Sequence, residues 1–154
     1  MSDRAPVVIR RARDGDLPRI VEIIAAGSVP GVPSPEGGDV ALYRSALQEI
    51  DGGAGAVLVA VLGADVVGVC QLIVFRHLQH RGALCAEIES VHVDAAHRSA
   101  GIGSTLLTRA VERARALGCY RVQLTSNVAR ADAHRFYERL GFVPSHVGYK
   151  LPLT

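Results

Sequence analysis

Apolar residues recur along the chain with two different periods, and each period predicts a different kind of element. Runs of strand length, rich in β-branched residues, occupy 6–12, 56–62, 66–75 and 85–94. Such runs, bounded by turn residues, are typical of strands. The second and third runs are separated only by Gly-Ala-Asp at 63–65, which predicts a hairpin. This part of the chain therefore favours a sheet.

Two helices are predicted between the first strand and this hairpin. The helix at 14–27 has Asp16 near its amino end, where a side-chain cap is expected. Its apolar face consists of Leu17, Ile20, Val21 and Ile24. The second helix is predicted at 40–50. Between the two, the stretch 28–39 is rich in proline and glycine, which predicts a loop.

The longest helical pattern begins after the fourth apolar run. Over 102–117 the apolar residues recur with the helical period and form one stripe: Ile102, Leu106, Leu107, Ala110, Val111, Ala114 and Leu117. Gly118 follows and predicts the carboxyl end of this helix. The rest of the chain predicts a strand at 120–126, a helix at 129–140 and closing strands within 142–153.

The predicted order of elements is β-α-α-β-β-β-α-β-α-β-β, which indicates a mixed α/β (α+β) fold. A chain of 154 residues suits one domain with a buried core, spanning 1–154. No internal repeat or long linker divides it. Apolar residues make up 49% and charged residues 21%, a composition typical of globular rather than disordered chains.

Charge and cysteine content argue against several classes of function. The net charge is only +2, which gives no support for a nucleic-acid or membrane-surface partner. The three separated cysteines, Cys70, Cys85 and Cys119, match neither a disulfide framework nor a zinc motif. The uncharged stretch 52–64 is too short to span a bilayer, and 1–16 lacks the apolar core of a signal peptide. We therefore expect a soluble cytoplasmic protein.

The stretch HRSAGIGSTLL, at 97–107, joins the fourth strand pattern to the long helix, a position where glycine-rich turns bind phosphate groups. A P-loop needs a Gly-Lys-Ser/Thr end, which is missing. A Rossmann loop is disfavoured because Leu106 stands where the third glycine belongs. The pattern that fits is R-x-x-G-x-G, formed by Arg98, Gly101 and Gly103. A tight strand–helix turn without a ligand is the alternative.

Three segments around and beyond this loop resemble one protein family. EIESVHVDAAHRSAGIG at 87–103, GCYRVQLTSN at 118–127 and HRFYERLGF at 134–142 resemble the GCN5-related N-acetyltransferases (GNAT), which move an acetyl group from acetyl-coenzyme A to an amine. The order of elements agrees over nearly the whole chain. The resemblance implies a GNAT fold: a mixed central sheet of six to seven strands with about four helices. It also implies acetyl-coenzyme A as the cosubstrate.

The resemblance further implies where the cosubstrate lies. In such enzymes the glycine loop holds the pyrophosphate through backbone amides, which here belong to Arg98, Ser99, Ala100, Gly101, Ile102, Gly103 and Ser104. The pantetheine arm lies along the fourth strand like an added strand, at Val91, His92 and Val93. Family members often carry an asparagine seven residues before a catalytic tyrosine, and this chain has Arg130 there. Asn127 is then the candidate contact to the arm. Arg130 either reaches the coenzyme phosphates or is a solvated surface residue.

Acetyl transfer needs a base for the amine and a proton donor for the departing thiolate. By resemblance, Glu87 is the candidate base, Glu89 is the second choice, and Tyr137 is the candidate acid that faces the coenzyme sulfur. The alternatives are two solvated carboxylates and a half-buried aromatic side chain. Strand alternation is expected to divide the fourth strand into two faces, with Glu87, Glu89, Val91 and Val93 on one and Ile88, Ser90 and His92 on the other.

The acceptor pocket is expected between the third and fourth strand patterns, where the family often builds it and where this chain has His77, His80 and Arg81. Two histidines at this spacing can bind a divalent metal, but without a third ligand exposed loop histidines are favoured. HLQH at 77–80 and SNVARADAHRFY at 126–137 look most like aminoalkylphosphonate N-acetyltransferases. Other segments are similar to glucosamine-6-phosphate N-acetyltransferases.

These resemblances imply one function and leave two alternatives. We expect direct transfer, in a ternary complex, from acetyl-coenzyme A to a small primary amine that carries a phosphonate or a phosphate. The alternatives are a noncatalytic acetyl-coenzyme A-binding regulator and an acetyltransferase of protein or peptide amines. The oligomeric state stays open, with a homodimer as the candidate assembly.

Overall fold

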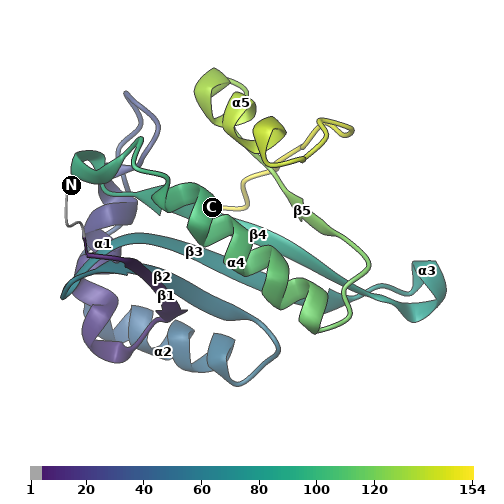
Figure 1. Ribbon diagram of the computed structural model, residues 1–154, viewed down its shortest axis with the longest axis horizontal. Coiled ribbons are helices and arrows are strands. Elements are labelled where there is room, and N and C mark those ends of the chain that lie inside the picture. The colour runs from purple at the N-terminus through teal and green to yellow at the C-terminus, as the bar shows by residue number, and fades with distance from the viewer. Residues whose placement is uncertain (1–4) are drawn as a thin grey trace.

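A sheet with strand order β1-β2-β3-β4-β5 runs through the computed structural model, which describes residues 5–154 (Figure 1). Its strands are β1 (Val7–Arg11), β2 (Ala56–Leu62), β3 (Asp65–Arg76), β4 (Leu84–Val93) and β5 (Val122–Leu124). The helices are α1 (Leu17–Ala26), α2 (Val40–Asp51), α3 (Gln79–Gly82), α4 (Ile102–Ala116) and α5 (Ala131–Arg139). Two short 3₁₀ turns, Asp14–Asp16 and Ala95–His97, precede α1 and α4. The predicted mixed α/β fold is confirmed.

The predicted count of six to seven strands is wrong, because the described residues form five. The closing strands expected within 142–153 are missing there, and the side chains of Tyr149, Leu151 and Leu153 are 92%, 84% and 90% exposed. A strand needs a neighbour that takes up its main-chain hydrogen bonds. No strand of the described chain pairs with this segment. The described helices number five rather than four, and α3 is only four residues long.

Helices cover both faces of the sheet. α4 covers one face, where Leu106 packs with Leu72 and Ile88 in a fully buried cluster. α1 and α2 cover the other face, where Ile20 packs with Val59 in a second cluster. We call these the α4 face and the α1/α2 face. The stripe predicted for α4 is confirmed at its most buried positions, which are Ile102, Leu106, Leu107, Ala110 and Ala114.

The two amino-terminal helices begin differently. Asp39 caps α2, because its carboxylate accepts a hydrogen bond of 2.9 Å from the amide of Ala41. Asp16 precedes α1 as predicted but makes no such cap. Its carboxylate instead accepts from the Arg10 guanidinium at 2.6 Å, and this contact holds the pKa of Asp16 below its usual value. Within residues 5–154, no helix has the length and apolar character that crossing a bilayer requires.

β4 is paired unequally on its two sides. Along its length it pairs antiparallel with β3, from Leu84 opposite Arg76 to Val93 opposite Gly68. On the other side it pairs with β5, in parallel, only from Ala86 to Ile88. Figure 1 shows β5 leading away from the sheet toward α5, which stands apart from the other helices. This separation leaves part of β4 open.

Candidate functional site

A bulge interrupts β4 at Ser90. The pairing with β3 passes from His92 opposite Val69 to Glu89 opposite Gln71, so the intervening residues of β4 outnumber those of β3 by one. Ser90 takes a left-handed conformation with φ +53°. A bulge of this kind re-aims the side chains that follow it.

The bulge makes the predicted division of β4 wrong beyond Glu89. His92 lies on the α1/α2 face, where a Cβ atom added to Gly27 at the end of α1 would collide with its ring. Val91 and Val93 pack instead with the α4-face cluster. The observed α1/α2-face set is Glu87, Glu89, Ser90 and His92, and the α4-face set is Ile88, Val91 and Val93.

The outer part of β4 has an open main-chain edge. Beyond Ile88, within the described chain, no strand pairs with β4 on the side of β5. An extended ligand can add to such an edge through main-chain hydrogen bonds. Val91 and Val93, predicted to contact the pantetheine arm, lie on this open stretch. Their contact with a cosubstrate stays a prediction.

The loop that follows β4 is anchored at its start. The Asp94 carboxylate accepts a hydrogen bond from His97 Nδ1 at 3.0 Å and forms an ion pair with the Arg19 guanidinium at 3.1 Å. The hydrogen bond from His97, aided by the nearby positive charges, holds the pKa of Asp94 below its usual value. Arg98 Nε donates to Val93 O at 3.2 Å. The loop therefore enters α4 from a fixed position.

Gly101 gives α4 an open amino end. It stands at the N-cap with φ +79°, a left-handed conformation that favours glycine, and no described side chain caps the helix. The first amides of α4, those of Ile102, Gly103 and Ser104, have no acceptor within the helix. A Cβ atom at Gly101 would meet no described atom within 4 Å. An anion can therefore approach these amides and the positive end of the helix dipole.

Gly103 serves a different purpose from Gly101. A Cβ atom at Gly103 would lie 3.2 Å from Phe136 Cζ and 3.6 Å from Val93 Cγ2. The missing side chain therefore lets α4 pack closely against α5 and the end of β4. Of the two glycines in the R-x-x-G-x-G pattern, only Gly101 therefore has open space beside it.

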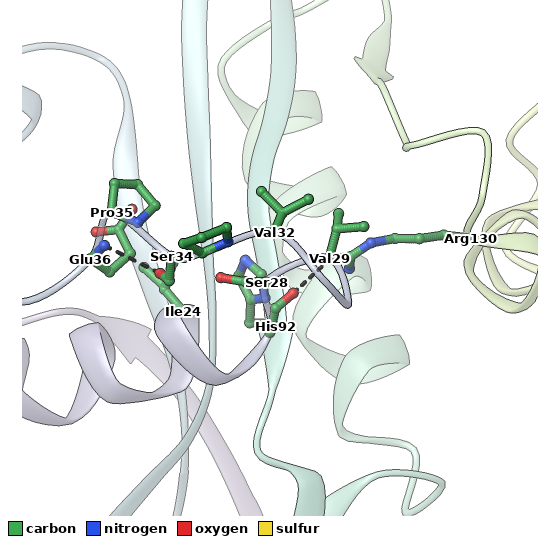
Figure 2. Close-up of a pocket in the computed structure, with 11 residues that line it drawn as sticks. Ile24, Ser28, Val29, Val32, Ser34, Pro35, Glu36, His92 and Arg130 are labelled. Atoms are coloured by element: carbon green, nitrogen blue, oxygen red, sulfur yellow. Dashed lines mark hydrogen bonds between the residues drawn. The ribbon is translucent and has the colours of Figure 1, made fainter.

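A pocket of about 240 Å³ opens between the segment after α1 and the outer end of β4 (Figure 2). The segment from Ser28 to Glu36 forms one wall, and His92 and Arg130 complete it. Arg130 reaches in from the side of α5, and its guanidinium donates to Gly27 O at 2.6 Å. Burial, and then the charges of Arg130 and Arg98, lower the pKa of His92. The pocket therefore holds a cationic guanidinium beside an imidazole that is neutral at pH 7.

Sequence reasoning missed the role of the segment after α1. The only available signal was its proline- and glycine-rich composition, which predicts a loop but not what the loop faces. Arg130 was predicted, with Asn127, to contact the coenzyme. Asn127 Oδ1 accepts from the amide of Ala129 at 2.9 Å, so this side chain shapes the turn before α5. Coenzyme contacts by Asn127 and Arg130 stay predictions.

Two glutamates and a glutamine meet where β4 and β5 are joined. Gln123 Nε2 donates to Glu87 Oε2 at 2.9 Å, and the two residues are direct partners across the strands. Glu89 is half-buried on the same face. Burial, and then the adjacent Glu87, raise the pKa of Glu89, whereas the charge of Lys150 opposes that rise. The predicted base and its second choice therefore form one pair.

Tyr137 stands on α5, facing β4. Its ring lies 5.3 Å from that of Phe136 and 6.0 Å from that of Phe142, measured between ring centroids. Burial raises the pKa of its hydroxyl, with Cys70 and Glu89 adding to the rise and Arg130 opposing it. Tyr137 therefore keeps its proton at neutral pH, as the proposed acid must.

The predicted acceptor residues lie at the other end of β4. His80 and Arg81 lie in α3 and His77 lies just before it, at the far tip of the β3–β4 connection (Figure 1). His77 Nδ1 is 3.2 Å from the Tyr120 hydroxyl, and the His80 and Tyr120 ring centroids are 4.3 Å apart. The structure does not bring this cluster to the pocket of His92 and Arg130. Among residues 5–154, no three His, Cys, Asp or Glu side chains are grouped to hold a metal ion.

Comparison with known proteins agrees with this geometry. The model of the acetyltransferase (GNAT) family matches residues 24–142. An aminoalkylphosphonate N-acetyltransferase from Salmonella typhimurium is 40% identical over 87 residues, which are 56% of each chain. A glucosamine 6-phosphate N-acetyltransferase from Trypanosoma brucei brucei is 36% identical over 77 residues, 50% of each chain. The present chain thus spans about half the length of these curated relatives.

A solved structure extends the likeness to nearly the whole chain. A protein from Bacillus halodurans, described as a transcriptional regulator, is 38% identical with a TM-score of 0.88, covering 96% of this chain and 100% of its own.

Proposed function

Because this chain belongs to the acetyltransferase (GNAT) family, we propose that it transfers the acetyl group of acetyl-coenzyme A to a small primary amine, directly in a ternary complex. One observation carries the proposal. The open edge of β4 runs from the Glu87–Glu89 pair to the uncapped end of α4, so an extended arm and its pyrophosphate fit along one line. The reactive end of that arm then lies beside the carboxylates.

The side chains at this end suit acetyl transfer. Glu87 accepts a proton from the ammonium, and the free amine nitrogen attacks the thioester carbonyl. The new C–N bond forms, the C–S bond breaks, the departing thiolate takes a proton from Tyr137, and the second proton that the nitrogen loses as it becomes an amide returns to the Tyr137 oxygen. Both the proton acceptor and the proton donor come from this chain, and no acyl-enzyme is needed.

We further propose that the acceptor amine carries a phosphonate or phosphate. The two curated relatives are named for aminoalkylphosphonate and for glucosamine 6-phosphate, which both pair an amine with a phosphorus oxyanion. The pocket of His92 and Arg130 offers a guanidinium suited to an oxyanion. We place the oxyanion there rather than at His77, His80 and Arg81, whose cluster is at the far tip of the sheet.

A homodimer is the assembly that the carboxyl-terminal segment supports. Val147, Tyr149, Leu151 and Leu153 are apolar at alternate positions, as in a strand, and all are highly exposed. The sheet edge at β5 has one neighbour only. A second copy supplies the strand partner that the described chain lacks. We expect light scattering to find a dimer for the full chain and a monomer for a chain that is truncated after Gly148.

One alternative has its own support. The relative from Bacillus halodurans is described as a transcriptional regulator, which fits a noncatalytic protein that binds acetyl-coenzyme A. The presence of Glu87 and Tyr137 favours the enzyme, because binding alone needs neither a base nor an acid.

A panel of amines tests the proposal. Release of coenzyme A thiol is followed with aminoalkylphosphonates, amino-sugar phosphates, matched uncharged amines and lysine peptides. We expect turnover that is fastest with the anionic small amines. Binding of acetyl-coenzyme A without thiol release from any amine would favour the regulator, and turnover restricted to peptides would refute the proposed acceptor class.

A further inference from the structure

β5 supplies a polar side chain to the candidate base. The bond of 2.9 Å from Gln123 Nε2 to Glu87 Oε2 lies within the short stretch where β4 and β5 are joined. Both side chains are half-buried. The parallel pairing of β4 and β5 fixes the backbone at Glu87 and at Gln123, so both partners of this hydrogen bond are held in position.

The other end of the Gln123 amide is also engaged. Its Oε1 lies 3.8 Å from Cys85 Sγ, and the side chain of Cys85 is fully buried. A thiol is a weak donor and an amide oxygen only accepts, so this contact directs Nε2 toward Glu87. Ala86 O, at 3.7 Å from the same sulfur, is a second acceptor for the thiol.

Glu87 and Glu89 compete for protons. They stand two residues apart on one face of β4, and two nearby carboxylates resist ionising together. An N–H group stabilises only the ionised form of the carboxylate that it contacts. Gln123 contacts Glu87, and among the described residues it makes no hydrogen bond to Glu89. This contact therefore favours a negative charge on Glu87 over a negative charge on Glu89.

We propose that Gln123 is a positioning residue that holds Glu87, rather than Glu89, as the proton-accepting member of the pair. Its effect on rate rests on the proposed acetyl transfer, whereas the distribution of protons does not. In the reaction, the acceptor ammonium gives its proton to Glu87.

Few other groups around the pair affect this distribution. Lys150, from the carboxyl-terminal segment, and Tyr137, from α5, are the charged and titratable groups that face Glu89. β3 presents the uncharged Gln71 and Ile73 opposite Glu89 and Glu87. Since Lys150 and the backbone hydrogen bond from Ser90 both favour an ionised Glu89, they oppose the arrangement, and the bond from Gln123 acts against them.

Two matched variants separate this role from a general effect on the sheet. Gln123→Met keeps the length of the side chain and removes the donor. Gln71→Met is the control, because Gln71 pairs with Glu89 on β3 as Gln123 pairs with Glu87 on β5. Gln123→Glu, which keeps the shape and replaces the donor with a carboxyl group, serves as the second test variant.

The pH profile of kcat/KM is the first measurement. We expect the acid limb to move upward by about one pH unit in Gln123→Met and farther in Gln123→Glu. At acid pH this is a loss of roughly tenfold in rate, which largely disappears at high pH. Gln71→Met should leave the limb where it is in the wild type.

A titration of the Glu89 carboxyl carbon by NMR is the second measurement, and it needs no turnover. In Gln123→Met the Glu89 midpoint should move to lower pH, because Glu87 then shares the proton. If the wild type acetylates no amine, the proposed function fails while this titration still tests Gln123. Unchanged Glu89 midpoints in both Gln123 variants, or an equal movement in Gln71→Met, would overturn the proposal.

Discussion

The two halves of β4 differ in how many neighbours they have. From Ala86 to Ile88 the strand has β3 on one side and β5 on the other, and both neighbours fix its backbone. From Glu89 to Val93 it has β3 alone among the described strands. The fully paired half can hold a catalytic side chain still. The half-paired one keeps main-chain groups free for a ligand.

The bulge at Ser90 marks the change from one half to the other. It turns His92 toward the α1/α2 face and into the pocket with Arg130, while Val91 and Val93 pack on the α4 face. A regular strand would have placed His92 under α4. One strand thus supplies the candidate base, an open edge and a wall of the pocket, and each is tested by changing one half at a time.

The largest effect is expected in the paired half. Glu87→Gln removes the proton acceptor, so kcat/KM should fall by about 10²- to 10⁴-fold. The loss should be greatest at low pH, where the amine is protonated and deprotonation limits the rate. Steady-state thiol release across the pH range measures this effect. A wild-type rate at low pH would remove Glu87 from the mechanism.

The next largest effect is expected at Tyr137 on α5. Tyr137→Phe loses only the hydroxyl, so kcat should drop by about 10²-fold while the affinity for coenzyme A stays the same. Calorimetric titration with coenzyme A, beside kcat, separates the two quantities. Weaker binding of coenzyme A with an unchanged kcat would mean that Tyr137 contributes to binding and not to proton transfer.

Beyond the open half, at the start of α4, Gly101 is where a smaller effect is expected. Gly101→Val forces a β-branched residue into a left-handed backbone at a cost of about 1–2 kcal/mol, which should weaken coenzyme A binding by roughly tenfold. Gly63→Val is the matched control, since Gly63 also has a positive φ and open surroundings but lies in the β2–β3 hairpin. Equal loss of binding in both variants would mean a general effect on folding.

The smallest effect concerns the acceptor. Arg130→Ala should raise KM for an anionic amine by about fivefold and leave KM for an uncharged analogue nearly unchanged. Arg81→Ala, at the tip beyond the paired half, should change both by less than about twofold. If Arg81→Ala raised KM for the anionic amine and Arg130→Ala did not, the oxyanion-binding site would lie at the tip around α3 instead.

Most elements were predictable from the sequence because their apolar patterns are regular. The hairpin of β2 and β3 and the stripe on α4 follow directly from such patterns. The faces of β4 were wrong because alternation assumes an unbroken strand, and nothing in the residues around Ser90 announces a bulge. The closing strands were wrong because their alternation is genuine but finds no partner in the described chain. Gln123 was missed because its importance comes from its neighbour across the sheet.

Hydrogen exchange of backbone amides, with and without coenzyme A, tests the difference between the two halves most directly. We expect the coenzyme to protect amides within Glu89–Val93 and Arg98–Ser104, because the arm adds to the open edge and the pyrophosphate meets the start of α4. Amides of the paired half and of the tip around α3 should change little. Protection at α3 without any in Glu89–Val93 would contradict this site for the cosubstrate.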